Sequence, residues 1–176
     1  MIVGLADSGG SRIEQGVDFD ALYAAQWWPM LRLAQGLVDD VAAAEDVVQD
    51  AFAALYRRRT TLRESQAAVG YLRVSVVNAA RSALRRRRTA RNHLHALHEG
   101  HEPPADQAAL LSAEHQQVRA ALAELPDRQR EVLSLRYLSD LSDPEIAEAT
   151  GLSLGGVRSA ASRGLAVLRS SLGGQS

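Results

Sequence analysis

Apolar side chains recur along most of this chain at steps of three and four residues, the spacing of one face of an α-helix. The first such run starts at Asp18, and Pro29 inside it either kinks one helix or opens a second. The pattern predicts an all-α protein. The further helices are expected at 41–58, from near Ala68 to about 91, at 107–125, 127–138, 144–150 and 154–172.

Two stretches interrupt the helical pattern and divide the chain. Residues 1–17 are rich in glycine and serine and are predicted to form a flexible tail. Residues 92–106 contain Gly100, Pro103 and Pro104, which favour a flexible linker. The sequence therefore predicts two small helical domains, at 18–91 and 107–176.

Composition supports this picture and limits the class of protein. Of 176 residues, 46% are hydrophobic but only 5% aromatic, so the cores must consist mainly of Ala, Leu and Val, which favours helices. No apolar run is long enough to cross a bilayer, and the N-terminus lacks a signal-peptide pattern. We expect a cytoplasmic protein without membrane insertion. The absence of cysteine excludes disulfides and thiolate metal sites.

The formal net charge of -1 hides a strong segregation of charge. Residues 1–56 carry two arginines and nine acids, whereas residues 57–91 carry eleven arginines and the single acid Glu64. Residues 92–176 carry seven arginines and eleven acids. The middle block is therefore the expected place for a bound polyanion.

The arginines of this block keep a helical register. Asn78, Arg81, Arg85 and Arg88 follow one another at steps of three, four and three, so they form one stripe of the third helix, almost opposite the apolar side of Leu72. A solvated helix face is the alternative, but such a face normally mixes charges of both signs. The stripe indicates a nucleic-acid contact surface.

The segment 141–169 has the features of a helix-turn-helix. Ser142 and Glu145 form a capping-box pattern, Pro144 lies in the first turn, and Gly151 permits a tight turn. Ser153 is a plausible cap of the next helix. That helix is predicted to bury one small apolar face and to present a polar one, as a DNA recognition helix does. The predicted polar face consists of Arg158, Ser159, Ser162, Arg163 and Arg169.

Three segments, AEDVVQDAFAALYRRR, GYLRVSVVNAARSALRRRR and LPDRQREVLSLRYLSDLSDPEIAEATGLSLGGVRSAASRGLAVLR, occur in this order. Together they resemble an extracytoplasmic-function RNA polymerase sigma factor of the sigma-70 family, over residues 18–172. Such factors keep only the second and fourth conserved domains and join them by a linker. The resemblance implies sigma domain 2 at 18–91, a helical bundle, and sigma domain 4, with the helix-turn-helix, at 107–176.

The resemblance implies a function without catalysis: binding core RNA polymerase, directing it to promoters and stabilising promoter melting. The helix at 45–58 is expected to dock on the clamp helices of the beta-prime subunit through Asp46, Gln49 and Asp50, residues that simple solvation could also explain. The helix Asp127–Leu138 is expected to help dock on the flap of the beta subunit. An anti-sigma factor is a further implied partner.

The same resemblance assigns residues to promoter DNA. Asn78 matches the asparagine beside a flipped base of the upstream melting element, the loop at 60–66 lines that base's pocket, and Arg81, Arg85 and Arg88 hold the backbone. Arg158, Ser159, Ser162 and Arg163 read the distal promoter element. The Gly155–Gly156 pair stands where the family usually has Gly-Thr, and it loosens the start of the recognition helix.

Other readings of the sequence are weaker. A stand-alone helix-turn-helix regulator is the main alternative for 107–176, but residues 18–91 lack the alternating strands and helices of a receiver domain. No arrangement typical of an active site rises above chance, so we expect no catalytic residue and no cofactor. The cluster of His93, His95, His98 and His101 lies in the predicted linker without a fixed geometry, and we expect no metal there.

Overall fold

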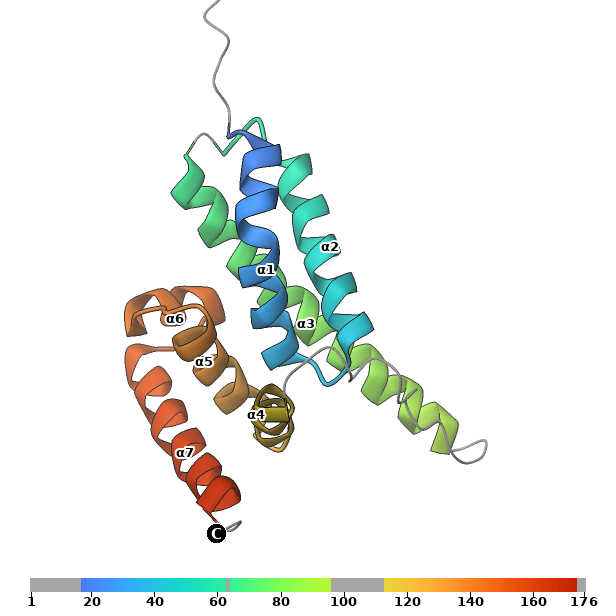
Figure 1. The fold of residues 1–176 in the computed structure, drawn as a ribbon, viewed down its shortest axis with the longest axis vertical. Coiled ribbons are helices and arrows are strands. Elements are labelled where there is room, and N and C mark those ends of the chain that lie inside the picture. Colours follow the sequence, from blue (N-terminus) through green and yellow to red (C-terminus); the bar gives the residue numbers. More distant parts are fainter. Residues whose placement is uncertain (1–16, 63, 96–112, 174–176) are drawn as a thin grey trace, which may run out of the picture.

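The computed structural model describes residues 17–62, 64–95 and 113–173. Within these residues the chain forms seven helices and no strand (Figure 1), which confirms the all-α prediction. None of the described helices is long and apolar enough to span a membrane. The helices are α1 (Phe19–Leu37), α2 (Val41–Arg57), α3 (Ser65–His95), α4 (Ala113–Ala123), α5 (Asp127–Leu138), α6 (Asp143–Thr150) and α7 (Leu154–Gly173).

Helices α1, α2 and α3 pack on one another and form the N-terminal module. Their apolar stripes meet in a core in which Leu33, Val48 and Leu72 are completely buried. The Asp18 and Asp40 carboxylates cap α1 and α2 by accepting hydrogen bonds from backbone N–H groups two or three residues ahead. Helix α1 continues through Pro29, so this proline does not open a second helix.

Helix α3 is longer at both ends than the sequence predicted. It begins at Ser65, inside the predicted loop, and runs to His95, four residues into the predicted linker. Residues 92–95 contain neither glycine nor proline, so the helix meets no breaker there. The predicted tail at 1–16, the rest of the linker and the start of the predicted helix at 107 lie outside the described residues.

Helices α4 to α7 form the C-terminal module around Leu133, Leu135, Ile146 and Val157. Helix α6 begins with the predicted capping box, in which the Glu145 carboxylate accepts hydrogen bonds from the N–H (2.8 Å) and the hydroxyl (2.6 Å) of Ser142. Helix α6 ends at Thr150 and is followed by Gly151, whose φ of 73° is a left-handed conformation that glycine adopts without steric cost.

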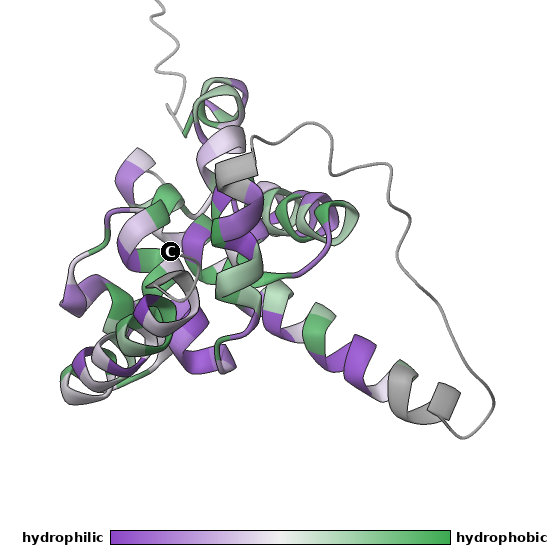
Figure 2. Ribbon diagram, turned by 60° about the horizontal axis from the view of Figure 1, so that its bottom comes forward, coloured by the Kyte–Doolittle hydropathy of each residue, from purple (hydrophilic) through white to green (hydrophobic). Residues whose placement is uncertain are grey.

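The two modules pack against each other. Helix α5 lies along the C-terminal half of α1, and α6 contacts α3 (Figure 1). The contact is close, because a Cβ atom added to Gly36 of α1 would lie 2.7 Å from the Ser134 hydroxyl of α5. Beyond this contact the C-terminal end of α3 extends away from the other helices in both views (Figure 1, Figure 2).

Candidate nucleic-acid interface

The polar stripe of α3 is divided between solvent and the C-terminal module. Asn78, Arg85 and Arg88 are exposed, whereas the Arg81 side chain is only 35% exposed. The α3 residues Val77, Ala80 and Leu84 lie between the two modules, the first two being buried. They follow one another at steps of three and four residues, and this spacing is the sequence signal that α3 has a second apolar face.

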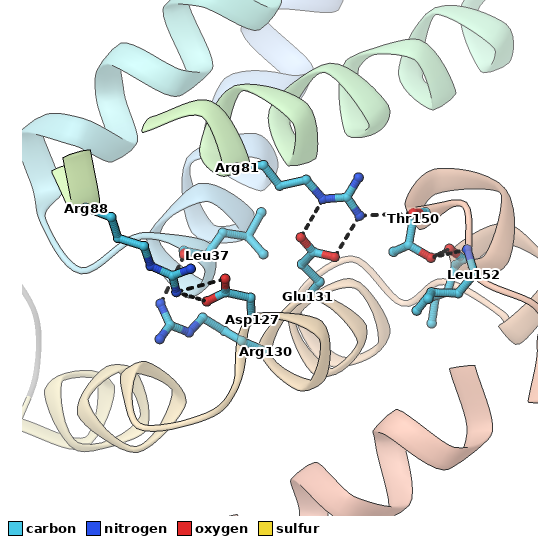
Figure 3. A network of polar contacts seen from close by, with 9 residues as sticks. Leu37, Arg81, Arg88, Asp127, Arg130, Glu131, Thr150 and Leu152 are labelled. Carbon is cyan, nitrogen blue, oxygen red and sulfur yellow. Dashed lines mark hydrogen bonds and ion pairs between the residues drawn. The ribbon is translucent and has the colours of Figure 1, made fainter. Parts of the chain in front are cut away.

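Arg81 is held by the C-terminal module in a bidentate ion pair (Figure 3). Its Nε and Nη2 donate to the two carboxylate oxygens of Glu131 at 2.6 and 2.7 Å, and Nη2 also donates to the Thr150 carbonyl at 3.0 Å. The Glu131 side chain is only 8% exposed. Hydrogen bonding to Glu131 raises the pKa of the Arg81 guanidinium above its ordinary value, so the guanidinium stays charged.

Arg88 forms a second ion pair between the modules. Its Nη2 lies 3.0 Å from each carboxylate oxygen of Asp127 (Figure 3). Arg85 lies between these two pairs along the helix and makes no ion pair with any described residue. A hollow of about 270 Å³ is lined by Arg81, Leu84, Arg85, Arg88, Asp127 and Glu131.

The region predicted to hold a flipped base lies at the start of α3. Asn78 follows Tyr71 by seven residues, which places it about 10 Å further along the helix. Tyr71 is half-buried, and the Arg58 guanidinium lies 5.5 Å from the centroid of its ring. The described loop residues are exposed except Leu62, which is half-buried, while position 63 is not described.

Trp27 and Trp28 have different surroundings. Trp27 is half-buried, and its ring centroid lies 6.2 Å from that of Phe52, so it packs on the core. Trp28 is 67% exposed.

The three predicted polymerase anchors share the outer face of α2. Asp46, Gln49 and Asp50 are all exposed, and their side chains form no hydrogen bond or ion pair with another described residue. The opposite face, which includes Val47 and Val48, is buried against the other helices of the module. This acidic face is available to a partner even while the two modules are packed together.

Helix α7, the predicted recognition helix, has the two predicted faces. Arg158, Ser159, Ser162 and Arg163 are exposed. The Ser153 hydroxyl accepts a hydrogen bond from the N–H of Gly156 at 3.1 Å, which caps the helix as expected. The side that packs on the module consists of Val157, Ala160, Ala161 and Gly164, with Leu168 half-buried.

A groove of about 430 Å³ runs beside the recognition helix. Asp143, in the first turn of α6, forms ion pairs with Arg136 of α5 and, at 3.4 Å, with Arg158 of α7. No sequence motif pointed to Arg136 or Asp143, because the distance between these two side chains depends on how α5, α6 and α7 pack. The groove is lined by Arg136, Asp143, Arg158, Ala161, Ser162, Leu165 and Arg169.

No group of three or more metal-ligating side chains occurs within the residues that the structure describes. The backbones of His93 and His95 belong to α3, but their side chains, together with His98 and His101, lie outside the described part.

The described residues form two separate cationic surfaces, on α3 and α7, and one acidic face on α2.

Comparison with known proteins matches both modules. Residues 29–90 match the family described as Sigma-70 region 2, and residues 115–168 match Sigma-70, region 4. The chain is 32% identical over 156 residues to an RNA polymerase sigma-E factor of Streptomyces coelicolor, covering 89% of this chain and 86% of the relative. An RNA polymerase sigma-E factor of Streptomyces antibioticus is 30% identical over 161 residues, covering 89% and 85%.

Two solved structures share the arrangement of helices. CnrH, in complex with the cytosolic domain of CnrY, is 25% identical with a TM-score of 0.66, covering 90% of this chain and 89% of that chain. The sigma factor RpoE of Bartonella quintana, in complex with the anti-sigma factor NepR, is 23% identical with a TM-score of 0.72, covering 90% and 99%. The second likeness concerns the fold alone.

Proposed function

This chain belongs to the sigma-70 family of RNA polymerase sigma factors, as an extracytoplasmic-function member, and from its faces we propose how it performs that function. A sigma factor directs RNA polymerase to promoters. The observation that carries the assignment of roles is the presence of three separate exposed polar faces, on α2, α3 and α7, each on a segment matched to the family.

The acidic face of α2 is proposed to bind core polymerase. Asp46, Gln49 and Asp50 would be its contacts with the beta-prime clamp helices, and α5 would contribute to docking on the beta flap. These three side chains are exposed and have no partner among the described residues, which supports the first assignment, because they can bind a partner without breaking a described contact. The protein would act by binding, without a catalytic residue or cofactor.

The α3 face is proposed to hold the melted promoter strand. Asn78 would contact an extruded base, and Arg81, Arg85 and Arg88 would bind backbone phosphates. Extruding a base costs a few kcal/mol, which contacts to the extruded base must offset. The exposure of Asn78 and Arg85 supports the proposal, while Arg81 and Arg88 would exchange the carboxylates of Glu131 and Asp127 for phosphates.

The recognition helix α7 is proposed to read the distal promoter element through Arg158, Ser159, Ser162 and Arg163. Arg136 and Arg169, which line the adjoining groove, are well placed for phosphates at the edge of that contact. Helix α7 forms despite its two early glycines, since the Ser153 cap satisfies a backbone donor of the first turn.

The partners are proposed on the same basis. Two structurally similar chains were solved in complexes, one of them with an anti-sigma factor, and we propose that an anti-sigma factor also binds this chain. The site of action would be the cytoplasm, where polymerase and promoter DNA are found.

Run-off transcription with purified core polymerase and a library of promoter templates tests the function. Defined transcripts that require this protein, and that share two upstream elements, are the expected result. The absence of both core binding and transcripts, with a control sigma factor active in the same assay, would overturn the assignment.

A further inference from the structure

We propose that the turn after α2 is a phosphorylation site, at Thr60 or Thr61, for a serine/threonine kinase that recognises arginines, and that the added phosphate blocks promoter melting. The turn consists of residues 58–62, between α2 and α3. The inference rests on the proposed strand-binding role of the α3 face, because the turn enters the loop that the family resemblance places around the extruded base.

The sequence contains the same basic pattern at two places. Residues 57–61 read RRRTT and residues 85–89 read RRRRT, so Thr60, Thr61 and Thr89 each have arginine at the second and third positions before them. Kinases that select their substrates by charge bind such arginines with acidic side chains. The sequence alone therefore offers three candidate acceptors.

The structure separates these candidates by their accessibility. Thr89 lies inside α3, and its hydroxyl donates a hydrogen bond to the Arg85 carbonyl at 3.1 Å. Thr60 and Thr61 are exposed residues of the turn, and their hydroxyls form no hydrogen bond with any described residue. An enzyme can straighten a surface turn at less cost than a helix, because a helix must first break several backbone hydrogen bonds. The turn is therefore the better acceptor.

The arginines of the turn are available to a kinase. Arg59 lies over the exposed ring of Tyr56, with its guanidinium 4.1 Å from the ring centroid. The Arg58 guanidinium lies 5.5 Å from the centroid of Tyr71. Neither arginine forms an ion pair with a carboxylate among the described residues. Both can thus bind the acidic side chains of a kinase before the reaction and the new phosphate after it.

The reaction needs a nucleoside triphosphate as the phosphoryl donor. The threonine Oγ1 forms a bond to the γ-phosphorus, the bond from that phosphorus to the β–γ bridging oxygen breaks, and a nucleoside diphosphate leaves. The hydroxyl proton passes to a base of the kinase. The product carries about two negative charges at neutral pH, where the hydroxyl carried none.

The new charge lies where it opposes binding of the melted strand. Thr61 is four residues before Ser65, the first residue of α3, and Arg58 of the turn lies near Tyr71 of that helix. A phosphate there repels the phosphates of the strand and neutralises Arg58 and Arg59. The distal-element face on α7 belongs to the other module. The modified protein should therefore still form the closed promoter complex but fail to hold the open strand.

Incubation of the native protein with ATP and an arginine-directed serine/threonine kinase, followed by peptide mass spectrometry, tests the site. We expect phosphate on Thr60 or Thr61 and not on Thr89. Thr60→Val/Thr61→Val should abolish labelling of the turn, and Thr89→Val should leave this labelling in place. No incorporation, or incorporation at Thr89 in preference to the turn, would overturn the site.

Comparison of the same chain with and without phosphate tests the consequence. Holoenzyme with phosphorylated protein should show at least about tenfold less permanganate reactivity of the melted strand than after phosphatase treatment of the same sample, with closed-complex formation unchanged. The difference should shrink at high salt, because the phosphate is exposed. Equal opening before and after phosphatase, or an equal loss of closed complexes, would overturn the block of melting. Failure of the phosphatase-treated and untreated protein to open any promoter would instead overturn the proposed function.

Discussion

At the scale of single residues, two arginines of this protein lie where both a protein carboxylate and a DNA phosphate can reach them. Arg81 binds the Glu131 carboxylate in the structure, and promoter phosphates are its proposed second partner. Arg158 likewise pairs with Asp143 on the surface proposed to read DNA. Arginine suits such exchange, because its guanidinium is always charged and binds carboxylate and phosphate in the same geometry.

Asn78 offers the sharpest residue-level prediction about promoter melting. Asn78→Ala should reduce strand opening more than closed-complex formation, because an exposed amide contributes to binding only once a base is extruded. Permanganate footprinting measures the open strand. Ser82→Ala, one helical turn further along α3, is the matched control. A footprint identical to that of wild type would contradict the role of Asn78.

Asp143 is predicted to restrain the arginines beside the recognition helix. Asp143→Asn removes the charge that holds Arg136 and Arg158, so binding of unrelated DNA by the holoenzyme should tighten and depend on salt more steeply, by about one unit of slope. Asp140→Asn is the control, since Asp140 has a φ of 51° that asparagine also tolerates. An unchanged salt slope for Asp143→Asn would argue that Asp143 serves only α6.

At the scale of elements, two glycines of the same helix are predicted to respond oppositely to substitution. A Cβ on Gly164 would lie 2.8 Å from Leu133 Cδ1 and 3.3 Å from Gln129 Cβ, so Gly164→Val should push α7 from α5 and cost about 1–3 kcal/mol. Nothing lies near a Cβ on Gly155, so Gly155→Ala should stabilise by up to about 1 kcal/mol. Urea unfolding followed by circular dichroism measures both.

The cap of α6 makes a prediction about pH. The hydrogen bonds from the hydroxyl and the backbone N–H of Ser142 lower the pKa of Glu145 below its ordinary value. A carboxylate with a lowered pKa in the folded state stabilises above the unfolded value, 4.5, and this contribution is lost as the pH falls through the folded pKa. Glu145→Gln should therefore melt earlier than wild type at pH 7, and the gap should shrink at acid pH.

At the scale of the whole molecule, the two modules are joined more closely than a linker requires. Helix α5 packs on α1, and two ion pairs, Arg81–Glu131 and Arg88–Asp127, connect α3 to the same module. Two of the proposed DNA-binding arginines of α3 are neutralised by carboxylates of the C-terminal module. The positive potential of α3 is therefore weaker in this packed arrangement than the number of its arginines suggests.

Arg85 and Arg88 of α3 test the proposed phosphate contacts. Replacing Arg85 and Arg88 together with alanine should weaken holoenzyme binding to all promoters and reduce the salt slope by about two, since each loses one phosphate contact. Arg32→Ala, an exposed arginine of α1, should leave the slope unchanged. A loss confined to one promoter sequence would indicate base reading instead.

The sequence by itself determined the helices, the caps and the helix-turn-helix. These depend on residues within about four positions of each other, such as Ser142 with Glu145 or Asp18 with Ala21, so the local order of side chains suffices. It also placed Asn78 and Arg85 on one exposed stripe of α3. The predicted end of the third helix, at about residue 91, is wrong by four residues, because residues 92–95 contain no glycine or proline that would end a helix.

Only the tertiary structure decided which partners the charged stripe has in the free chain. Glu131 is fifty residues from Arg81 and Asp127 is thirty-nine from Arg88, and any of the acids in the second half of the chain could have filled those places. The choice depends on the close approach of Gly36 and Ser134, which fixes α5 on α1. Burial then makes the selected ion pair costly to break, a property that belongs to the packing and not to the order of residues.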